Sequence, residues 1–356
     1  MSIRNLHHLF GPRTVAVIGA SQREHSVGAT VLGVLDWARA RNIGFSKFIS
    51  LGDSCDVDVG DVLDYLASDA DTRAILLYIE DIRAARKFMS AARAAARGKP
   101  VLVIKAGRAA EGARAAASHT GALAGSDAVY DAAIRRAGML RVSSAEELFD
   151  AVETLAHARP LRGERLAIMT NGGGPGVMAT DALIACHGRL ASLSIDTLRR
   201  LDSILPATWS GANPVDIIGD APVARYQQTM ETLLHDGAAD ALLFIHAPTA
   251  IVPSADIAAA LVPLVQATPT NVIACWLGGP AVAQARSLFS AAGVPTFDTP
   301  EAALQGFMQM VQFRRNQDLL MQAPPALASH FTPDREAARA IARRVLAEGR
   351  QMLSEP

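Results

Sequence analysis

The 356-residue sequence predicts an α/β protein built from two doubly wound domains with parallel sheets. Half of the residues are apolar, so the chain can bury a large core, and its length exceeds that of one average domain. Short β-branched runs alternate with longer alanine-rich segments of helical periodicity, and glycines or small polar residues separate them. Such connections form right-handed crossovers, which place the strands parallel in one sheet with helices on both faces.

The expected elements fall into two series. The first series of apolar runs predicts strands at 14–19, 45–51, 74–79, 100–104 and 140–142. The second predicts strands at 165–170, 189–193, 241–245, 271–276 and 294–297. Helices are expected between them, including 27–40, 175–187, 223–235 and 280–292. We therefore expect one domain at 1–160 and another at 161–321, followed at 322–356 by a linker and a charged helix over 333–354.

Composition excludes several classes of partner. The formal net charge of −1 gives no global field that would attract a polyanion, so neither nucleic acid nor an anionic membrane is an expected partner. Cys55, Cys186 and Cys275 are far apart and lack zinc-site spacing, so we expect no metal site and no disulfide scaffold. The chain shows no export signal and no run of eighteen apolar residues. A cytoplasmic location is expected.

Two glycine-containing turns precede helices and could bind an anion, because a helix N-terminus offers free N–H groups and a positive dipole end. The first runs from Gly19, Ala20 and Ser21 to Gly28, and it reads equally well as a tight strand-to-helix turn. The second is the segment 170–182, in which three glycines precede Pro175, expected at the first helical position. Three consecutive glycines are costly to order, which favours an exposed anion-binding hollow there.

A histidine lies in a third such loop. His119 sits in the small-residue segment 115–127, just after the predicted strand 100–104, and ligands of open α/β sheets bind at the carboxyl ends of strands. A neutral imidazole can accept a phosphoryl group, and two helix N-termini would stabilise the phosphohistidine. Glu80, at the end of a neighbouring strand, could hold the other ring nitrogen. An ordinary surface histidine and a solvated carboxylate remain the alternatives.

Five segments together resemble the NDP-forming acyl-CoA synthetases: 36–52, 76–80 (LLYIE), 118–127 (SHTGALAGSD), 171–182 (NGGGPGVMATDA) and 211–217 (GANPVDI). That superfamily includes succinyl-CoA synthetase, ADP-forming acetyl-CoA synthetase and multidomain proteins with an appended lysine acetyltransferase. The resemblance covers nearly the whole chain. It implies two flavodoxin-like, three-layer α/β/α domains.

The resemblance also implies roles for individual residues. His119 would be the phosphorylated histidine and Glu80 the residue that orients it. Asn171, Asn213 and Asp216 would support the second glycine-rich loop. The implied phosphate-binding residues are Gly19, Ala20, Ser21, Gly28, Ser118, Thr120, Gly121, Gly172, Gly173, Gly174 and Gly176.

Departures from the family pattern bear on activity. Residues 1–35 are too few for the family's CoA-binding domain, which needs about a hundred residues, so most of that domain is expected to be missing. No ATP-grasp domain is expected either, and the closing helix resembles the stretch that leads into one. Asp53 stands where asparagine is common in the family, and its negative charge would weaken phosphate binding.

The resemblance implies CoA, ADP or ATP with Mg, and phosphate as ligands. It implies a chain with acid-thiol ligase chemistry that converts acyl-CoA, phosphate and ADP into acid, CoA and ATP, or the reverse. A partner with an ATP-grasp domain, such as a β-type subunit, would bind the nucleotide, and a homo- or hetero-oligomer is possible. The alternative is a non-catalytic scaffold or regulatory subunit, or a decayed fragment of an acetyltransferase-fused protein. Whether the chain is an enzyme by itself stays open.

Overall fold

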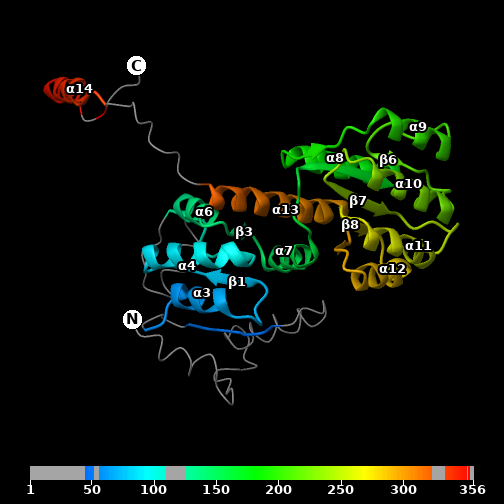
Figure 1. Cartoon of the computed structure of the whole chain (residues 1–356), viewed down its shortest axis with the longest axis horizontal. Coiled ribbons are helices and arrows are strands. Elements are labelled where there is room, and N and C mark those ends of the chain that lie inside the picture. The colour runs from blue at the N-terminus through cyan, green and yellow to red at the C-terminus, as the bar shows by residue number, and fades with distance from the viewer. Residues whose placement is uncertain (1–44, 52–55, 110–125, 323–332, 351, 353–356) are drawn as a thin grey trace, which may run out of the picture. The chain divides into compact units, whose positions relative to one another are not determined.

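The computed structural model describes residues 45–51, 56–109, 126–322, 333–350 and 352 (Figure 1). The chain divides into two compact units, Met1–Leu320 and Met321–Pro356. The predicted segments 14–19 and 27–40 lie outside the described residues.

The first sheet contains three described strands that are parallel and adjacent in chain order. They are β1 (Ile75–Ile79), β2 (Val101–Lys105) and β3 (Leu140–Val142). The helices around this sheet are α3 (Val59–Ser68), α4 (Ala85–Gly98), α6 (Asp127–Arg136) and α7 (Ala145–His157). Val101 and Val103 pack with α3, α4 and α6, whereas Leu102 packs with α7, so helices cover both faces of the sheet.

Residues 45–51 do not form the predicted strand. Their burial alternates residue by residue, as the apolar pattern predicts, with Ile49 and Leu51 packed against the core of α3 and α4. The described backbone of this segment nevertheless forms no ladder with β1. Side chains hold it instead, because Lys47 pairs with Asp69 at 2.7 Å and Ser46 hydrogen-bonds to Thr72.

The second sheet has the strand order β5-β4-β7-β8-β9, with β6 paired to the end of β4. Its strands are β4 (Arg165–Thr170), β5 (Arg189–Leu190), β6 (Val215–Asp216), β7 (Ala241–His246), β8 (Asn271–Trp276) and β9 (Thr296–Phe297). All its pairs are parallel. Apart from the short β6, this is the flavodoxin-like order, and the strand order reverses between β4 and β7. Ligands of such sheets bind at the carboxyl ends next to this reversal.

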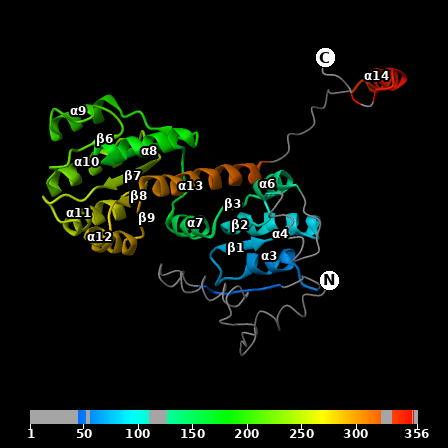
Figure 2. The ribbon, with the colours of Figure 1, turned by 180° about the vertical axis from the view of Figure 1, so that it is seen from behind.

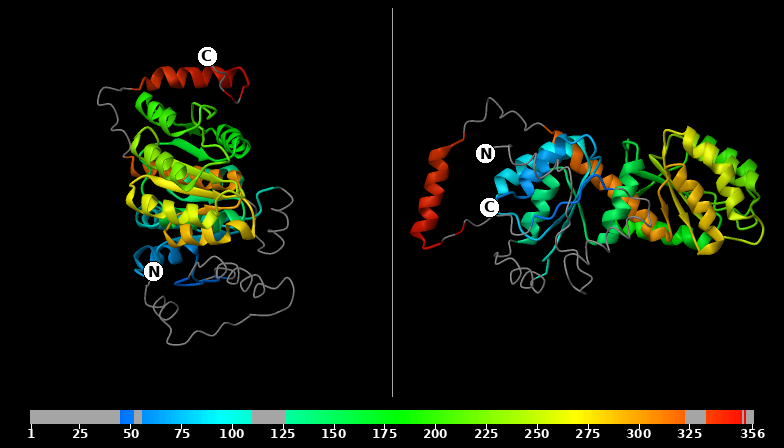
Figure 3. Two further views of the ribbon diagram at one scale, coloured as in Figure 1. Left: turned by 90° about the vertical axis from the view of Figure 1, so that its right-hand side faces the viewer. Right: turned by 90° about the horizontal axis from the view of Figure 1, so that it is seen from below.

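Successive side chains of β4 and β7 point to opposite faces of the second sheet and belong to two separate cores, one on each face. Met169 and Phe244 pack with the helices α9 to α12, whereas Ile168 and Leu243 pack with α8 and α13. Figures 2 and 3 show helices on either side of this sheet. These helices are α8 (Gly173–Ala185), α9 (Ile195–Ile204), α10 (Val223–His235), α11 (Ser254–Ala267), α12 (Pro280–Ala291) and α13 (Pro300–Met321). Helices thus cover both faces, and the predicted fold class is confirmed.

The 22-residue helix α13 was not expected from the sequence. It packs against a core of the first sheet and against a core of the second sheet. Its first half packs Phe307 and Met310 against the second sheet. Its second half packs Leu320 with the first core, and the Asn316 amide donates to the Met139 carbonyl at 2.6 Å. Arg315 also pairs with Glu164 at 2.5 Å.

Several predicted boundaries were too wide. The strands expected at 189–193 and 294–297 contain only two strand residues each, Arg189–Leu190 and Thr296–Phe297. The helix expected over 333–354 is α14 (Arg335–Ala347), which Asp334 caps and which ends before Gly349 in a left-handed conformation. Over the described ranges, none of the helices has the length and apolar character that a membrane span requires.

Candidate functional site

The glycine-rich loop lies at the reversal point of the second sheet, directly after β4. Asn171, which is 3 % exposed, joins this loop to the residue that follows β7. Its amide nitrogen donates to the Ala247 carbonyl at 2.8 Å, and its amide oxygen accepts the Ala247 N–H at 2.8 Å. The side chain of Asn171 therefore ties together the carboxyl ends of the two strands between which a ligand is expected.

Helix α8 begins earlier than predicted. Gly172 is the N-cap and Gly173 the first helical residue, so Pro175 stands at the third helical position rather than the first. Proline is tolerated there because the first four N–H groups of a helix have no partner within the helix. In the part of the chain that the structure describes, the N–H groups of Gly173 and Gly174 have no acceptor. Both lie at the positive end of the helix dipole.

The glycines of this loop differ in what a side chain would meet. A Cβ atom on Gly176 would lie 3.0 Å from Cγ2 of Thr170, so a side chain there would crowd Thr170. A Cβ on Gly173 would lie 3.1 Å from Oδ2 of Asp216. At Gly174 a Cβ would meet no atom within 4 Å, and its backbone is helical. Packing within the described chain does not account for a glycine at position 174, whereas close approach of a ligand would.

Asn213 and Asp216 fix the backbone beside this loop. The Asn213 side chain accepts the Ile168 N–H and donates to the carbonyls of Leu166 and Ala191, all at 2.9 Å, so it bridges β4 and the end of β5. Asp216 accepts the Ile218 N–H at 2.9 Å in a turn where Ile218 has φ of 66°. Both side chains therefore hold the backbone that lies beside the glycine-rich loop.

A buried histidine, which the sequence reasoning missed, lies beneath the same reversal point. His246 ends β7 and is fully buried, with Nδ1 3.3 Å from the Tyr226 hydroxyl and Nε2 3.1 Å from that of Ser254. Burial lowers the pKa of His246 to about 4. The ring is thus a neutral core group that supports Ala247, and it is inaccessible to substrate. No sequence signal distinguished it, because it sits in an apolar run like any core residue.

The predicted histidine His119 and its neighbours Ser118, Thr120 and Gly121 lie outside the described residues, as do Gly19, Ala20, Ser21, Gly28 and Asp53. The two ends of the histidine loop are described. The loop leaves the sheet after Lys105, the last residue of β2, and reaches α6 at Asp127. Ile79 pairs with Lys105, and the Ala106 N–H donates to the Ile79 carbonyl at 2.9 Å. Glu80, which follows Ile79 and is half-buried, therefore lies where the histidine loop departs.

A cluster of charged residues, also missed by the sequence reasoning, surrounds this edge of the first sheet. Lys105 is 5 % exposed, and its ammonium nitrogen lies 4.6 Å from the centre of the Tyr130 ring. The Tyr130 hydroxyl donates to Asp81 at 2.9 Å. Arg141 pairs with Asp127 at 2.5 Å. A lysine that ends an apolar strand was the one sequence signal available for this cluster.

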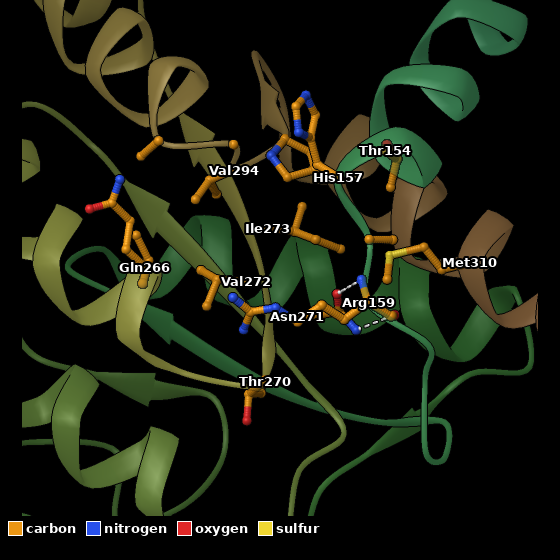
Figure 4. A pocket seen from close by; sticks show the side chains of 15 residues that line it. Thr154, His157, Arg159, Gln266, Thr270, Asn271, Val272, Ile273, Val294 and Met310 are labelled. Carbon is orange, nitrogen blue, oxygen red and sulfur yellow. Dashed lines mark hydrogen bonds between the residues drawn. The ribbon is translucent and has the colours of Figure 1, made fainter. Parts of the chain in front are cut away.

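Between described residues, no hydrogen bond or ion pair joins the glycine-rich loop after β4 to the charged cluster at the edge of the first sheet. A cavity of about 270 Å³ lies elsewhere, at the amino ends of β8 and β9 (Figure 4). Figure 4 shows His157, Arg159 and Asn271 along it, with two hydrogen bonds between Asn271 and the Arg159 backbone. It contains none of the predicted site residues. Among the described residues, no group of histidine, cysteine and carboxylate side chains could hold a metal ion.

Comparison with known proteins gives consistent matches. Residues 14–155 match the succinyl-CoA ligase like flavodoxin domain, and residues 166–299 match the ligase-CoA domain. The chain is 40% identical over 288 residues to ADP-forming acetate–CoA ligase I of Archaeoglobus fulgidus, covering 81% of this chain and 41% of that protein. It is 32% identical over 312 residues to the alpha subunit of ADP-forming acetate–CoA ligase I of Pyrococcus furiosus, covering 87% of this chain and 67% of that subunit.

A solved structure agrees with these matches. The dinucleotide-forming acetyl-coenzyme A synthetase 1 of Ca. Korarchaeum cryptofilum, in complex with phosphate and ADP, superposes with a TM-score of 0.79 at 33% identity. The superposition covers 85% of this chain and 66% of that one. This chain therefore spans between two fifths and two thirds of the length of these relatives. From its fold, its two domain matches and its relatives, the chain belongs to the NDP-forming acyl-CoA synthetase superfamily.

Proposed function

We propose that this chain carries the phosphohistidine half-reaction of an ADP-forming acyl-CoA synthetase. In the synthetase reaction, a phosphate oxygen attacks the thioester carbon of acyl-CoA and the thiolate of CoA leaves. A lone pair of the neutral His119 imidazole then attacks the phosphorus of the acyl phosphate, and the carboxylate leaves as the phosphorus–oxygen bond breaks. An ADP oxygen attacks the same phosphorus in the last step, which restores the neutral imidazole and yields ATP.

The observation that carries this proposal is the start of α8. The N–H groups of Gly173 and Gly174, which have no acceptor among the described residues, lie at the positive end of a helix and at the reversal point of a flavodoxin-like sheet. Gly174 has no packing partner that requires a glycine. A phosphoryl group would satisfy both N–H groups, and the absence of a side chain at Gly174 would keep its path free. In this proposal Asn171, Asn213 and Asp216 hold the loop in place.

The first sheet would supply the nucleophile. Glu80 lies where the histidine loop leaves β2. Its carboxylate would accept a hydrogen bond from one ring nitrogen of His119 and leave the other nitrogen free to attack phosphorus. Ser118, Thr120 and Gly121, together with Gly19, Ala20, Ser21 and Gly28, would bind the phosphoryl oxygens on the side of the first domain. We propose a domain at 1–160 that carries the histidine nucleophile and a domain at 161–321 that carries the glycine-rich loop.

The remaining groups would come from a partner. One relative is named as an alpha subunit, and a solved relative binds phosphate and ADP. By that likeness, a subunit with an ATP-grasp domain would bind ADP or ATP with Mg, whose charge would neutralise the transferred phosphate. The acyl-CoA and phosphate would meet His119 before that transfer.

Chemical phosphorylation tests the proposal without the partner. Phosphoramidate, a small phosphoryl donor for histidines, is incubated with the folded chain, and phosphopeptides are located by mass spectrometry under alkaline conditions. We expect preferential labelling of His119 among the nine histidines. His119→Ala should lose that label, whereas the control His235→Ala, which removes an exposed histidine on α10, should keep it. Equal labelling of exposed histidines, with none preferred, would contradict the proposal.

A further inference from the structure

The cavity at the amino ends of β8 and β9 is separate from the glycine-rich loop. Its volume is about 270 Å³, just below the ~300–1,000 Å³ of sites that hold drug-sized ligands, so it fits a smaller organic molecule. The glycine-rich loop lies at the carboxyl edge of the same sheet, and a six-residue strand such as β8 spans about 20 Å between the two edges. A small molecule in the cavity would therefore not contact that loop.

Residues of both matched domains line this cavity. Helix α7 supplies Thr154 and His157, the segment that connects the two sheets supplies Arg159, and α13 supplies Met310. The rest of the lining comes from β8, from the residues just before β8 and β9, and from the ends of α11 and α12. Ligand sites occur preferentially at such junctions between domains.

One side of the cavity carries a positive charge. The side chain of Asn271 accepts the Arg159 N–H at 2.8 Å and donates to the Arg159 carbonyl at 2.9 Å, which fixes the backbone of Arg159 at the start of β8. The Arg159 side chain is exposed, and its guanidinium has no hydrogen bond or ion pair with any described residue. Thr270, on the same side in Figure 4, adds a hydroxyl group. Among the described residues that line the cavity, none carries a carboxylate.

Apolar side chains line the cavity beyond Arg159. Val272 and Ile273 belong to β8, Val294 lies just before the neighbouring strand β9, and Met310 comes from α13. All four are buried. An aliphatic chain that runs from Arg159 along these side chains would leave water for an apolar surface, which is favourable.

Three helices end at the cavity, and the partial negative charge of a helix end favours a cation. These ends are already satisfied, because a backbone N–H just past each of α7, α11 and α12 donates to a carbonyl of the last turn at 2.9–3.2 Å. The Arg159 guanidinium, in contrast, is a full charge whose N–H groups match the two oxygens of a carboxylate. The lining therefore favours an anion, and an amine of equal length is the opposing probe.

We propose that this cavity binds a small aliphatic carboxylate. The carboxylate pairs with Arg159, and the chain lies along Val272, Ile273, Val294 and Met310. The bound molecule joins α7 and α13 to the amino edge of the second sheet. This inference does not rest on the proposed phosphohistidine function, because the cavity lies at the edge of the sheet opposite the glycine-rich loop.

The test is an NMR titration of the full chain, with isotope-labelled methyl groups of isoleucine and methionine and with hexanoate as the probe. We expect the methyl signals of Ile273 and Met310 to shift together and to saturate with one Kd of about 1 mM or less. Butanoate should bind about 15-fold more weakly, because each buried methylene contributes about fourfold. Hexylamine should bind at least about tenfold more weakly than hexanoate.

Variants of two arginines separate the site from the surface around it. Arg159→Met removes the charge at similar length and should weaken hexanoate binding at least about tenfold, with an unchanged melting temperature because the side chain is exposed. Arg159→Lys should recover part of the loss. Arg162→Met is the matched control, because Arg162 is an exposed arginine of the same connecting segment that does not line the cavity, and it should keep the wild-type Kd.

Three results would overturn the inference. They are methyl signals that do not saturate up to about 50 mM hexanoate, equal binding of hexanoate and hexylamine, and equal losses in Arg159→Met and Arg162→Met. If Arg159→Met does not fold, the comparison of hexanoate with hexylamine on the wild-type chain decides. A chain that binds hexanoate but takes no phosphate at His119 would contradict the proposed function and leave this inference standing.

Discussion

Replacing Asn171 with alanine tests how the glycine-rich loop is held at the carboxyl edge of the second sheet. The Asn171 side chain makes two hydrogen bonds of 2.8 Å to the backbone of Ala247 and is almost fully buried. Alanine would leave the Ala247 N–H and C=O without these partners. Each lost bond costs about 1 kcal/mol net, and an unsatisfied buried group costs more. We therefore expect Asn171→Ala to lower the free energy of unfolding by about 2–4 kcal/mol.

Asn271 provides a matched control in the same domain. Its side chain accepts the Arg159 N–H at 2.8 Å and donates to the Arg159 carbonyl at 2.9 Å, and it is 8 % exposed. The pair of hydrogen bonds is the same, but it lies at the amino end of β8 (Figure 4). Asn271→Ala should therefore lower the free energy of unfolding by a similar amount, about 2–4 kcal/mol.

The two variants should differ in function. Urea unfolding gives the stability of each, and phosphoramidate labelling of His119 followed by the half-life of the phosphohistidine reports the site. We expect both variants to lose similar stability, but only Asn171→Ala to shorten the phosphohistidine lifetime, by at least about threefold. A loss of less than about 0.5 kcal/mol for Asn171→Ala would refute the assigned contacts. Equal lifetimes in the two variants would refute the link from Asn171 to the phosphate site.

Four other predictions concern single residues at or beneath the site. Glu80→Gln should slow His119 labelling by at least about tenfold, measured as the initial rate, while the melting temperature stays unchanged, and a wild-type rate would exclude Glu80 as the orienting group. Gly174→Ala should keep or raise the melting temperature, because its Cβ would meet open space, yet shorten the phosphohistidine lifetime. Gly176→Ala should instead lower the free energy of unfolding by about 1–3 kcal/mol, because its Cβ would lie 3.0 Å from Cγ2 of Thr170. A lower melting temperature for Gly174→Ala than for Gly176→Ala would contradict the packing. Since burial holds the folded-state pKa of His246 at about 4 against an ordinary 6.5, its contribution to stability is full above pH 6.5 and falls toward pH 4, by about 2 kcal/mol at pH 5. An NMR titration in which the His246 ring protonates near pH 6.5 in the folded chain would refute this.

Periodicity alone predicted most of the second sheet. The strands at 165–170 and 271–276 and the helix at 223–235 have the predicted boundaries, because each is a continuous apolar or amphipathic run with clear flanking turns. Helix α13 escaped prediction because it packs against two cores, so its apolar residues do not lie along one stripe. Residues 45–51 show the alternating burial of a strand but lack the backbone ladder, which depends on a neighbour that periodicity cannot identify.

The candidate site was predicted unevenly for a physical reason. Motif reasoning singled out Asn171, Asn213 and the glycines of segment 170–182, because glycine runs and the turn that contains Asn213 carry a local backbone requirement. It missed Lys105 and Tyr130, which meet only after folding, since β2 and α6 are brought together across the histidine loop. Charged residues on separate elements leave no short-range pattern in a sequence.

The most direct test of the central claim is the transfer of phosphate from ATP to His119. The full chain is incubated with radiolabelled Mg-ATP and an extract of the cells that express it, then recovered, and acid-labile, base-stable phosphate is measured in the wild type and in His119→Ala. The account predicts label on the wild type that is chased by added ADP, and none on His119→Ala. A folded wild-type chain without label, or label that persists in His119→Ala, would contradict the account.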